Sequence, residues 1–243
     1  MTPAESVIPS FPATSGSRLV ALADPRSQAA EQYRVLYHRL LRLAARRPAR
    51  IVAITSAGRG EGRTTTAANL ALTATGEGRS VLLVEADLRR PSIAGLFGLA
   101  PRAGLGEVLD GGAEASQAIA RVGNLSVLCA GKVRDPAVAL RSARIPALVE
   151  GWRAAYDHVY LDAPPALAFA DGDRLAAEAD LALLVVRVGV TRRQVVSLAL
   201  EALGDRAAGL VLNDLDPAAL PRGRWLQADL GPEEPAPRRA RGG

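Results

Sequence analysis

Short apolar runs alternate with helical stretches along most of the chain, and this rhythm predicts the fold. Apolar runs of strand length occur at Ile51 to Thr55, Val81 to Glu85, Leu125 to Leu128, His158 to Asp162, Leu181 to Val188 and Gly209 to Leu212. Between them, helical patterns cover Thr64 to Thr75, Ile145 to Ala155, Gly172 to Ala179 and Arg192 to Leu203. Such alternation is typical of an α/β protein with a doubly wound, mostly parallel sheet and helices on both faces. Ligands of these sheets bind at the carboxyl ends of the strands.

A further helix is predicted before the first strand, from Asp24 to Arg47. Asp24 and Pro25 supply a cap and a first-turn proline. Apolar side chains follow at helical spacing, namely Tyr33, Leu36, Leu40, Leu41 and Leu43. The two ends of the chain are rich in Pro, Gly, Ser and charge and show no periodicity. The sequence therefore predicts one domain over residues 19–216, with disordered tails at 1–18 and 217–243.

Composition narrows the class of protein. Of the 243 residues 49% are apolar but only 4% are aromatic, so Ala, Leu and Val must fill the core, as suits a helix-covered parallel sheet. Cys129 is the only cysteine, which excludes a disulfide framework and indicates a core residue in a reducing compartment. No apolar run has the length of a membrane helix, and the N-terminus lacks a secretory pattern. We therefore expect a cytoplasmic protein.

The charge of the chain adds little to the functional interpretation. The formal net charge is +5 and the pI is near 10.1. Nearly all the basic residues are arginines scattered along the chain, and Lys132 is the only lysine. Scattered arginine is more typical of a biased genome composition than of a nucleic-acid surface, so no specific nucleic acid is expected as a partner.

The segment between the first predicted strand and the next helix has the pattern of a phosphate-binding loop. Its glycines at 58, 60 and 62 permit a tight turn, and the helix start turns backbone N–H groups toward phosphate. Against the pattern G-x-x-x-x-G-K-[ST], Gly62 and Thr64 are kept, whereas Ala57 and Arg63 replace the first glycine and the lysine. We predict that a purine nucleoside triphosphate binds here. The expected contacts are Gly58, Gly60, Glu61, Gly62, Arg63, Thr64 and Thr65.

Acidic residues end two of the later strands. Glu85 and Asp87 close the apolar run that starts at Val81, and Asp162 closes the run that starts at His158. Because the carboxyl ends of parallel strands share one edge of the sheet, these carboxylates should face the P-loop, where they bind Mg²⁺ and offset phosphate charge. The predicted catalytic residues are Glu85, Asp87 and Asp162, and the predicted metal ligands are Thr64, Asp87 and Asp162.

At these residues the chain resembles the bacterial tyrosine kinases of capsule and exopolysaccharide synthesis, within the wider group of MinD-like and ParA-like P-loop ATPases. The resemblance extends from about Leu19 to Asn213. It is carried by the P-loop run from Thr55 to Ala71, by the segment V-E-A-D-L-R-R-P, and by Y-D-x-V-x-x-D-x-P-P followed by Asp171. The residues of these three motifs are more typical of the kinases than of the partitioning ATPases.

The resemblance implies that Mg-ATP binds between the three motifs and that its γ-phosphate passes to tyrosines of a neighbouring subunit. By position, the implied phosphate contacts are Gly60, Gly62, Arg63 and Thr64, and the implied metal ligands are Thr64 and Asp162. Glu85 or Asp87 is implied to help activate the acceptor hydroxyl. Members work with a membrane-embedded chain-length regulator whose cytosolic tail activates them, which implies recruitment to the inner face of the plasma membrane. They also form homo-oligomeric rings through a helical E-x-x-R-x-x-R motif.

Three positions depart from the family pattern. Arg63 replaces the P-loop lysine with a wider planar group, and Glu85 replaces an aspartate. Glu31 and Arg34 match the ring motif, but Tyr37 replaces its second arginine.

The acceptor tyrosines of the family are also missing, since the tail from Ala218 to Gly243 contains no tyrosine. Tyr33 and Tyr37 lie at helical spacing and are interpreted as packing residues. The leading hypothesis is an ATP-binding, tyrosine-kinase-like protein of polysaccharide export, with reduced activity. A non-catalytic scaffold and a ParA-like or MinD-like placement ATPase remain as alternatives.

Overall fold

The structure, a computed structural model, describes residues 18–167 and 174–215. Nearly all of both expected tails lies outside these residues, as do Asp171 and the start of the helix expected from Gly172. The chain divides after Asn213 into a compact unit and the remaining stretch from Asp214. The elements described below all belong to the first unit.

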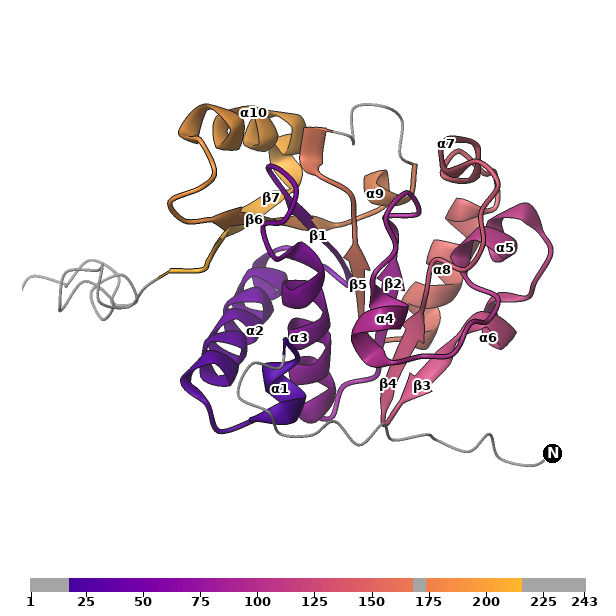
Figure 1. The fold of residues 1–243 in the computed structure, drawn as a ribbon, viewed down its shortest axis with the longest axis horizontal. Helices are drawn as coiled ribbons and strands as arrows, with labels where there is room; N and C mark the ends of the chain where they lie inside the picture. The colour runs from indigo at the N-terminus through magenta and orange to yellow at the C-terminus, as the bar shows by residue number, and fades with distance from the viewer. Residues whose placement is uncertain (1–17, 168–173, 216–243) are drawn as a thin grey trace, which may run out of the picture. The chain divides into compact units, whose positions relative to one another are not determined.

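Seven strands form one sheet in the described part of the chain (Figure 1). They are β1 (Ile51–Ser56), β2 (Val81–Glu85), β3 (Ala120–Val122), β4 (Leu125–Leu128), β5 (His158–Asp162), β6 (Leu181–Arg187) and β7 (Ala207–Asn213). Their order is β3-β4-β2-β5-β1-β6-β7, and every neighbouring pair is parallel except β3 with β4. The predicted doubly wound, mostly parallel sheet is confirmed. The sequence pattern does not predict β3, because a strand of three residues carries almost no periodicity.

The helices fall into long and short ones. They are α1 (Val20–Ala23), α2 (Gln28–Arg46), α3 (Arg63–Gly76), α4 (Ile93–Phe97), α5 (Leu105–Asp110), α6 (Ala115–Ala118), α7 (Pro136–Ala139), α8 (Ile145–Ala155), α9 (Arg174–Ala177) and α10 (Arg193–Leu203), followed by the 3₁₀ turn η2 (Gly204–Arg206). The predictions for α3, α8 and α10 are confirmed to within a residue or so at each end. None of the described helices has the length and apolar character that crossing a bilayer requires.

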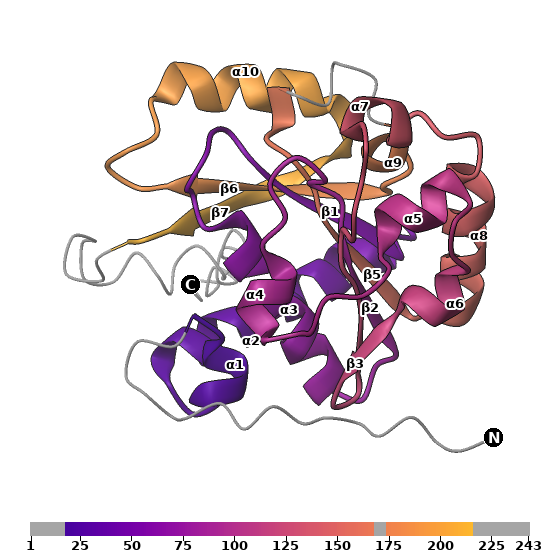
Figure 2. The same cartoon turned by 45° about the vertical axis from the view of Figure 1, so that its right-hand side comes forward.

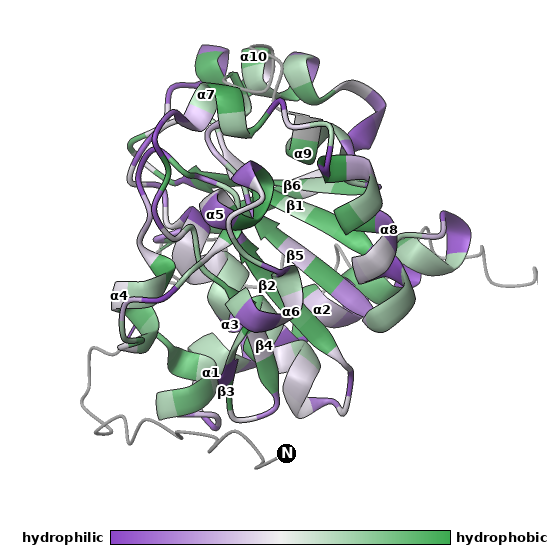
Figure 3. Ribbon diagram, turned by 90° about the vertical axis from the view of Figure 1, so that its right-hand side faces the viewer, coloured by the Kyte–Doolittle hydropathy of each residue, from purple (hydrophilic) through white to green (hydrophobic). Residues whose placement is uncertain are grey.

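Helices cover both faces of the sheet, so each face has its own apolar core (Figures 1 and 2). Leu83 packs on the face covered by α2, α3 and α4, whereas its neighbour Leu82 packs on the face covered by α5, α8 and α10. Successive strand residues point to opposite faces, so a strand buried on both sides is apolar throughout. Figure 3 shows this in the hydrophobic colour of the central strands. Cys129 is buried in the core on the face covered by α2, α3 and α4, and burial raises the pKa of its thiol to about 12.

The helix predicted from Asp24 begins four residues later, at Gln28. Ser27 is its N-cap, and the Ser27 hydroxyl accepts a hydrogen bond from the backbone N–H of Ala30 (3.1 Å). Asp24 instead ends the short helix α1. The predicted cap at Asp24 is therefore wrong. Because Ser and Asp are about equally good N-caps, the local sequence does not choose between them.

Tyr37 on α2 is a packing residue, with only 1% of its surface exposed. The two charged residues of the expected ring motif bind each other within the chain, with 2.6 Å between Arg34 Nη2 and Glu31 Oε2. Arg34 also donates a hydrogen bond to the backbone carbonyl of Pro25 (2.9 Å). Assembly through this motif stays a prediction.

Stability should fall on mild acidification because of His158, at the start of β5. Burial, and next the positive charge of Arg79, lower the pKa of His158 below its usual 6.5. The unfolded chain therefore takes up this proton at a higher pH than the folded one, so stability is full above about 6.5 and is lost as the pH falls through the folded pKa. Chemical denaturation between pH 7.5 and 5.0 should show wild type losing stability relative to His158→Gln. His38→Gln, at an exposed position of α2, is the matched control; an equal effect of both variants would contradict the prediction.

Candidate functional site

The loop between β1 and α3 has the conformation of a phosphate-binding loop. Gly60 and Gly62 both have positive φ, at 73° and 90°. At Gly62 a side chain is also excluded by space, because a Cβ there would overlap the side-chain nitrogen of Asn213. This loop leads directly into the first turn of α3 at Arg63. Backbone N–H groups at such a turn face the position of a bound phosphate.

Side chains hold the loop in this shape. The carboxylate of Glu61, 4% exposed, accepts hydrogen bonds from the backbone N–H of Ala57 (3.1 Å) and from the hydroxyl of Thr191 (2.8 Å). Asn213, the last residue of β7, donates to the backbone carbonyl of Glu61 (2.9 Å). Thr191 and Asn213 were not among the predicted site residues, since neither lies in a motif. They reach the loop because β6 lies next to β1 in the sheet and β7 lies next to β6.

The carboxyl ends of β1, β5 and β2 lie side by side, as the acidic strand ends predict. Asp162 on β5 pairs in register with Ile54 of β1 on one side and with Glu85 of β2 on the other. The backbone N–H of Asp87 donates to the backbone carbonyl of Asp162 (3.1 Å). Two segments far apart in the sequence therefore place their acidic residues at the edge of the sheet where β1 leads into the P-loop.

Arg63 joins the P-loop to two of these carboxylates. Its Nε lies 3.0 Å from Asp162 Oδ1, and its Nη2 lies 2.6 Å from Asp87 Oδ2. The third nitrogen, Nη1, lies 3.5 Å from the Ser56 hydroxyl. All three ionised side chains are largely buried, with exposed fractions of 13% for Arg63, 8% for Asp87 and 1% for Asp162. A lysine ammonium, as a compact point charge, has no planar fork to span both carboxylates in this way.

Known proteins are similar to this chain in sequence and in fold. A tyrosine-protein kinase of Bacillus subtilis, YwqD, is 37% identical over 82% of the chain and 88% of its own length. The chain belongs to the bacterial tyrosine-protein kinases. The resemblance inferred from the motifs is thereby confirmed, although no protein-family profile matches the chain.

A solved kinase domain and a transport protein extend the comparison. The kinase domain of the Escherichia coli tyrosine kinase ETK superposes with a TM-score of 0.78, at 30% identity, over 84% of the chain and 82% of that domain. The succinoglycan biosynthesis transport protein ExoP of Rhizobium meliloti is 32% identical over 87% of the chain, which spans 28% of the length of ExoP. The chain therefore has the P-loop nucleotide-binding fold of these kinases.

The carboxyl of Asp162 has a perturbed pKa. Burial raises its pKa to about 6, although the Arg63 guanidinium and hydrogen bonds from Thr64 and Arg63 favour the charged form. Asp162 therefore changes charge near pH 6. A protonated carboxyl is a poor metal ligand, so metal binding through Asp162 should weaken below this pH.

The carboxylate of Glu85 binds backbone N–H groups, which its position in the segment V-E-A-D-L-R-R-P does not indicate. Its Oε1 accepts hydrogen bonds from the backbone N–H groups of Ser92 and Ile93 (2.6 Å for Ile93), at the start of α4. Its Oε2 accepts from the backbone N–H of Ala130 (2.9 Å), just beyond β4. The side chain is only 1% exposed. Glu85 thus fastens α4 and β4 to the end of β2, and its catalytic role stays a prediction.

The remaining donors fit Mg²⁺ chemically, with one condition. Asp87, Asp162 and Thr64 offer carboxylate and hydroxyl oxygens, the ligands that Mg²⁺ prefers. The described residues contain no group of three or more His, Cys, Asp or Glu side chains suited to a metal, so nucleotide phosphates would have to complete the coordination. The guanidinium of Arg63 already holds both carboxylates. Mg²⁺ therefore fits here only if the guanidinium of Arg63 moves away from the carboxylates of Asp87 and Asp162.

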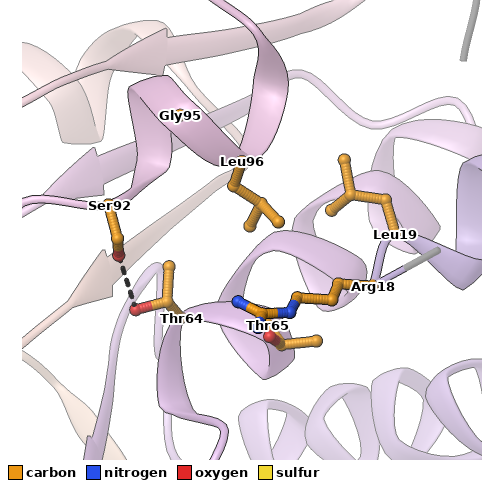
Figure 4. Close-up of a pocket in the computed structure, with 7 residues that line it drawn as sticks. All are labelled: Arg18, Leu19, Thr64, Thr65, Ser92, Gly95 and Leu96. Carbon is orange, nitrogen blue, oxygen red and sulfur yellow. Dashed lines mark hydrogen bonds between the residues drawn. The ribbon is translucent and has the colours of Figure 1, made fainter. Parts of the chain in front are cut away.

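Thr64, which hydrogen-bonds to Asp162, also lines a cavity of about 510 Å³ together with Thr65 (Figure 4). The opposite wall comes from α4, and the segment before α1 closes one side. The sequence does not predict this cavity, because α4 is too short to leave a helical pattern. The predicted contacts of Gly58, Gly60, Glu61, Gly62, Arg63, Thr64 and Thr65 with nucleotide stay predictions.

Proposed function

We propose that this chain is an ATP-dependent protein-tyrosine kinase of exopolysaccharide export whose P-loop arginine slows its turnover. The observation that carries the proposal is the convergence of the P-loop, Asp87 and Asp162 at the adjacent ends of β1, β2 and β5. Family membership supports tyrosine as the acceptor. The relation to ExoP, a succinoglycan biosynthesis transport protein, supports a role in polysaccharide export.

The residues of the site take complementary roles in this proposal. Backbone N–H groups of the P-loop hold the β- and γ-phosphates, and Thr64, Asp87 and Asp162 hold Mg²⁺, which offsets phosphate charge when bound. The phenolic oxygen of the acceptor forms a bond to the γ-phosphorus while the bond from that phosphorus to the bridging oxygen of ADP breaks. Asp87, whose carboxylate is more exposed than that of Asp162, accepts the phenolic proton. Arg63 stays near the phosphates as a positive charge.

The acceptor tyrosine belongs to another molecule. The chain has four tyrosines, at positions 33, 37, 156 and 160. Tyr37 and Tyr160 are 1% exposed, and Tyr33 and Tyr156 are half-buried in or beside α2 and α8. A tyrosine fixed in the core of its own domain does not reach the active site of the same domain. We propose a membrane-bound chain-length regulator as the partner that recruits the kinase to the cytoplasmic face of the membrane.

Replacing Asp162 by Asn should lower phosphate transfer by about a hundredfold or more, because the site loses a metal ligand and a buried charge opposite the phosphates. The assay follows transfer from radiolabelled ATP to a random copolymer of glutamate and tyrosine, in wild type and in Arg63→Lys. Asp110→Asn, an exposed change of the same kind on α5, is the matched control. Full activity of Asp162→Asn would rule out this active site.

A non-catalytic scaffold is the second candidate, because Arg63 holds the carboxylates that the kinase reaction needs. The same assay separates the two functions. If neither wild type nor Arg63→Lys transfers phosphate while both bind ATP, the scaffold is the better account. Measurable transfer by either protein that depends on Asp162 supports the kinase.

A further inference from the structure

The cavity beside the P-loop has one apolar side and one polar side. Leu19 and Leu96 provide aliphatic wall, and Gly95 leaves its part of the wall without a side chain (Figure 4). Thr64, Thr65 and Ser92 contribute hydroxyl groups, and Arg18 contributes a guanidinium. The volume of about 510 Å³ lies within the range of small-ligand sites. An apolar group with one polar tip matches these walls.

The polar side of the cavity connects directly to the kinase site. The Ser92 hydroxyl lies 3.3 Å from the Thr64 hydroxyl, and the side chain of Thr64 in turn hydrogen-bonds to Asp162. A group seated in the cavity is therefore one side chain away from the carboxylate expected to hold Mg²⁺. Glu85 holds the start of α4 in position, because its carboxylate accepts hydrogen bonds from the backbone N–H groups of Ser92 and Ile93, where the α4 wall of the cavity begins.

We propose that this cavity binds the phenol ring of the acceptor tyrosine, supplied by another protein chain. The ring lies between Leu19 and Leu96, and its hydroxyl points toward Thr64 and Ser92, on the side of the phosphates. Tyrosine has the required combination of an apolar body and a polar tip. Arg18, on the rim, offers a positive charge to the phosphorylated product. The inference rests on the proposed kinase function, since it names where that reaction takes its acceptor.

Gly95 allows a direct test, because a Cβ added there would meet no atom within 4 Å. Leucine at this position extends into the cavity from a helix, where it is also preferred over glycine. Gly151 on α8 is the matched control: it is exposed, helical and equally open around its Cβ. Both variants should fold, which circular dichroism and thermal melting check.

The experiment measures binding of N-acetyl-tyrosinamide, the probe, by NMR line broadening and chemical-shift titration, and measures ADP affinity on the same samples. Gly95→Leu should weaken probe binding by about tenfold or more, whereas Gly151→Leu should match wild type. N-acetyl-phenylalaninamide, which lacks the hydroxyl, should bind about fivefold more weakly than the tyrosine probe. ADP affinity should be the same in all three proteins.

Equal probe binding by Gly95→Leu and wild type would overturn the proposal, as would no binding to wild type at all. Inorganic phosphate that occupies the cavity while the tyrosine probe does not would assign it to an anion, and would also overturn it. A failure of the proposed kinase function can be told apart from a failure of this binding site. If the probe binds as expected but no variant transfers phosphate to the copolymer, the kinase reaction is wrong and the aromatic site remains.

Discussion

Replacing Arg63 by lysine should raise the rate of phosphate transfer by about tenfold or more, because it frees two carboxylates from charge-assisted hydrogen bonds. In the wild type these bonds run from the guanidinium to Asp87 and Asp162. Both bonds would have to break before Asp87 and Asp162 could hold Mg²⁺. A lysine ammonium interacts with one carboxylate or with a phosphate as a point charge and leaves room for the metal.

The metal dependence of nucleotide binding is the sharper readout. Wild-type affinity for ADP should change by less than about threefold between excess EDTA and saturating Mg²⁺, since the guanidinium already offsets the carboxylates. Arg63→Lys should gain about tenfold or more from Mg²⁺ in the same titration calorimetry. Arg59→Lys, an exposed change of the same kind in the loop, is the control and should resemble wild type. A strong Mg²⁺ requirement in the wild type would show that Arg63 does not compete with the metal.

Replacing Glu85 by glutamine should destabilise the fold by about 3 kcal/mol, the larger of the two stability effects that we expect. The carboxylate accepts three backbone N–H groups in a buried position. A glutamine amide keeps one accepting oxygen and turns an N–H₂ group toward the other donors, which leaves buried N–H groups unsatisfied. Urea unfolding followed by circular dichroism measures the change.

Glu201→Gln, on the exposed face of α10, is the control and should stay within about 0.5 kcal/mol of wild type. Glu85→Asp is the informative second variant, because it restores the residue usual in the family. Its carboxylate is one methylene shorter, so it should lose either the α4 contacts or the Ala130 contact and also destabilise the chain. A fully stable Glu85→Gln protein would remove the structural role that we assign to Glu85.

The fold was predictable where the pattern was long. Strands β2, β4 and β5 have the expected boundaries, since each is a run of buried residues, apart from the half-buried His158 that begins β5. The short helices were not predictable, because one or two turns hold too few residues for periodicity to register. The most important helix that the sequence does not predict is α4, since it forms a wall of the cavity beside Thr64.

The sequence predicts that Asp87 and Asp162 lie at the same edge of the sheet as the P-loop, but it does not predict which side chains pair there. Glu85 and Asp87 are two residues apart and chemically alike, yet the first turns to α4 and the second to Arg63. β2 ends at Glu85, so strand alternation no longer fixes the direction of Asp87. Likewise the sequence identifies Arg63 as a departure, whereas its bridge between two strand ends depends on the order β2-β5-β1. Local sequence does not contain that order.

The side chains that support the P-loop also have a kinetic consequence. Glu61, Thr191 and Asn213 hold the loop in shape by hydrogen bonds within the protein. A loop that is already ordered loses little conformational entropy when phosphate arrives, so more of the contact energy is left for affinity. Entry and departure of nucleotide then require no folding or unfolding of the loop. In the proposed kinase, the phosphate and metal contacts would then set the lifetime of the bound nucleotide, and we expect Arg63, which holds two of the carboxylates, to influence the rate of its release.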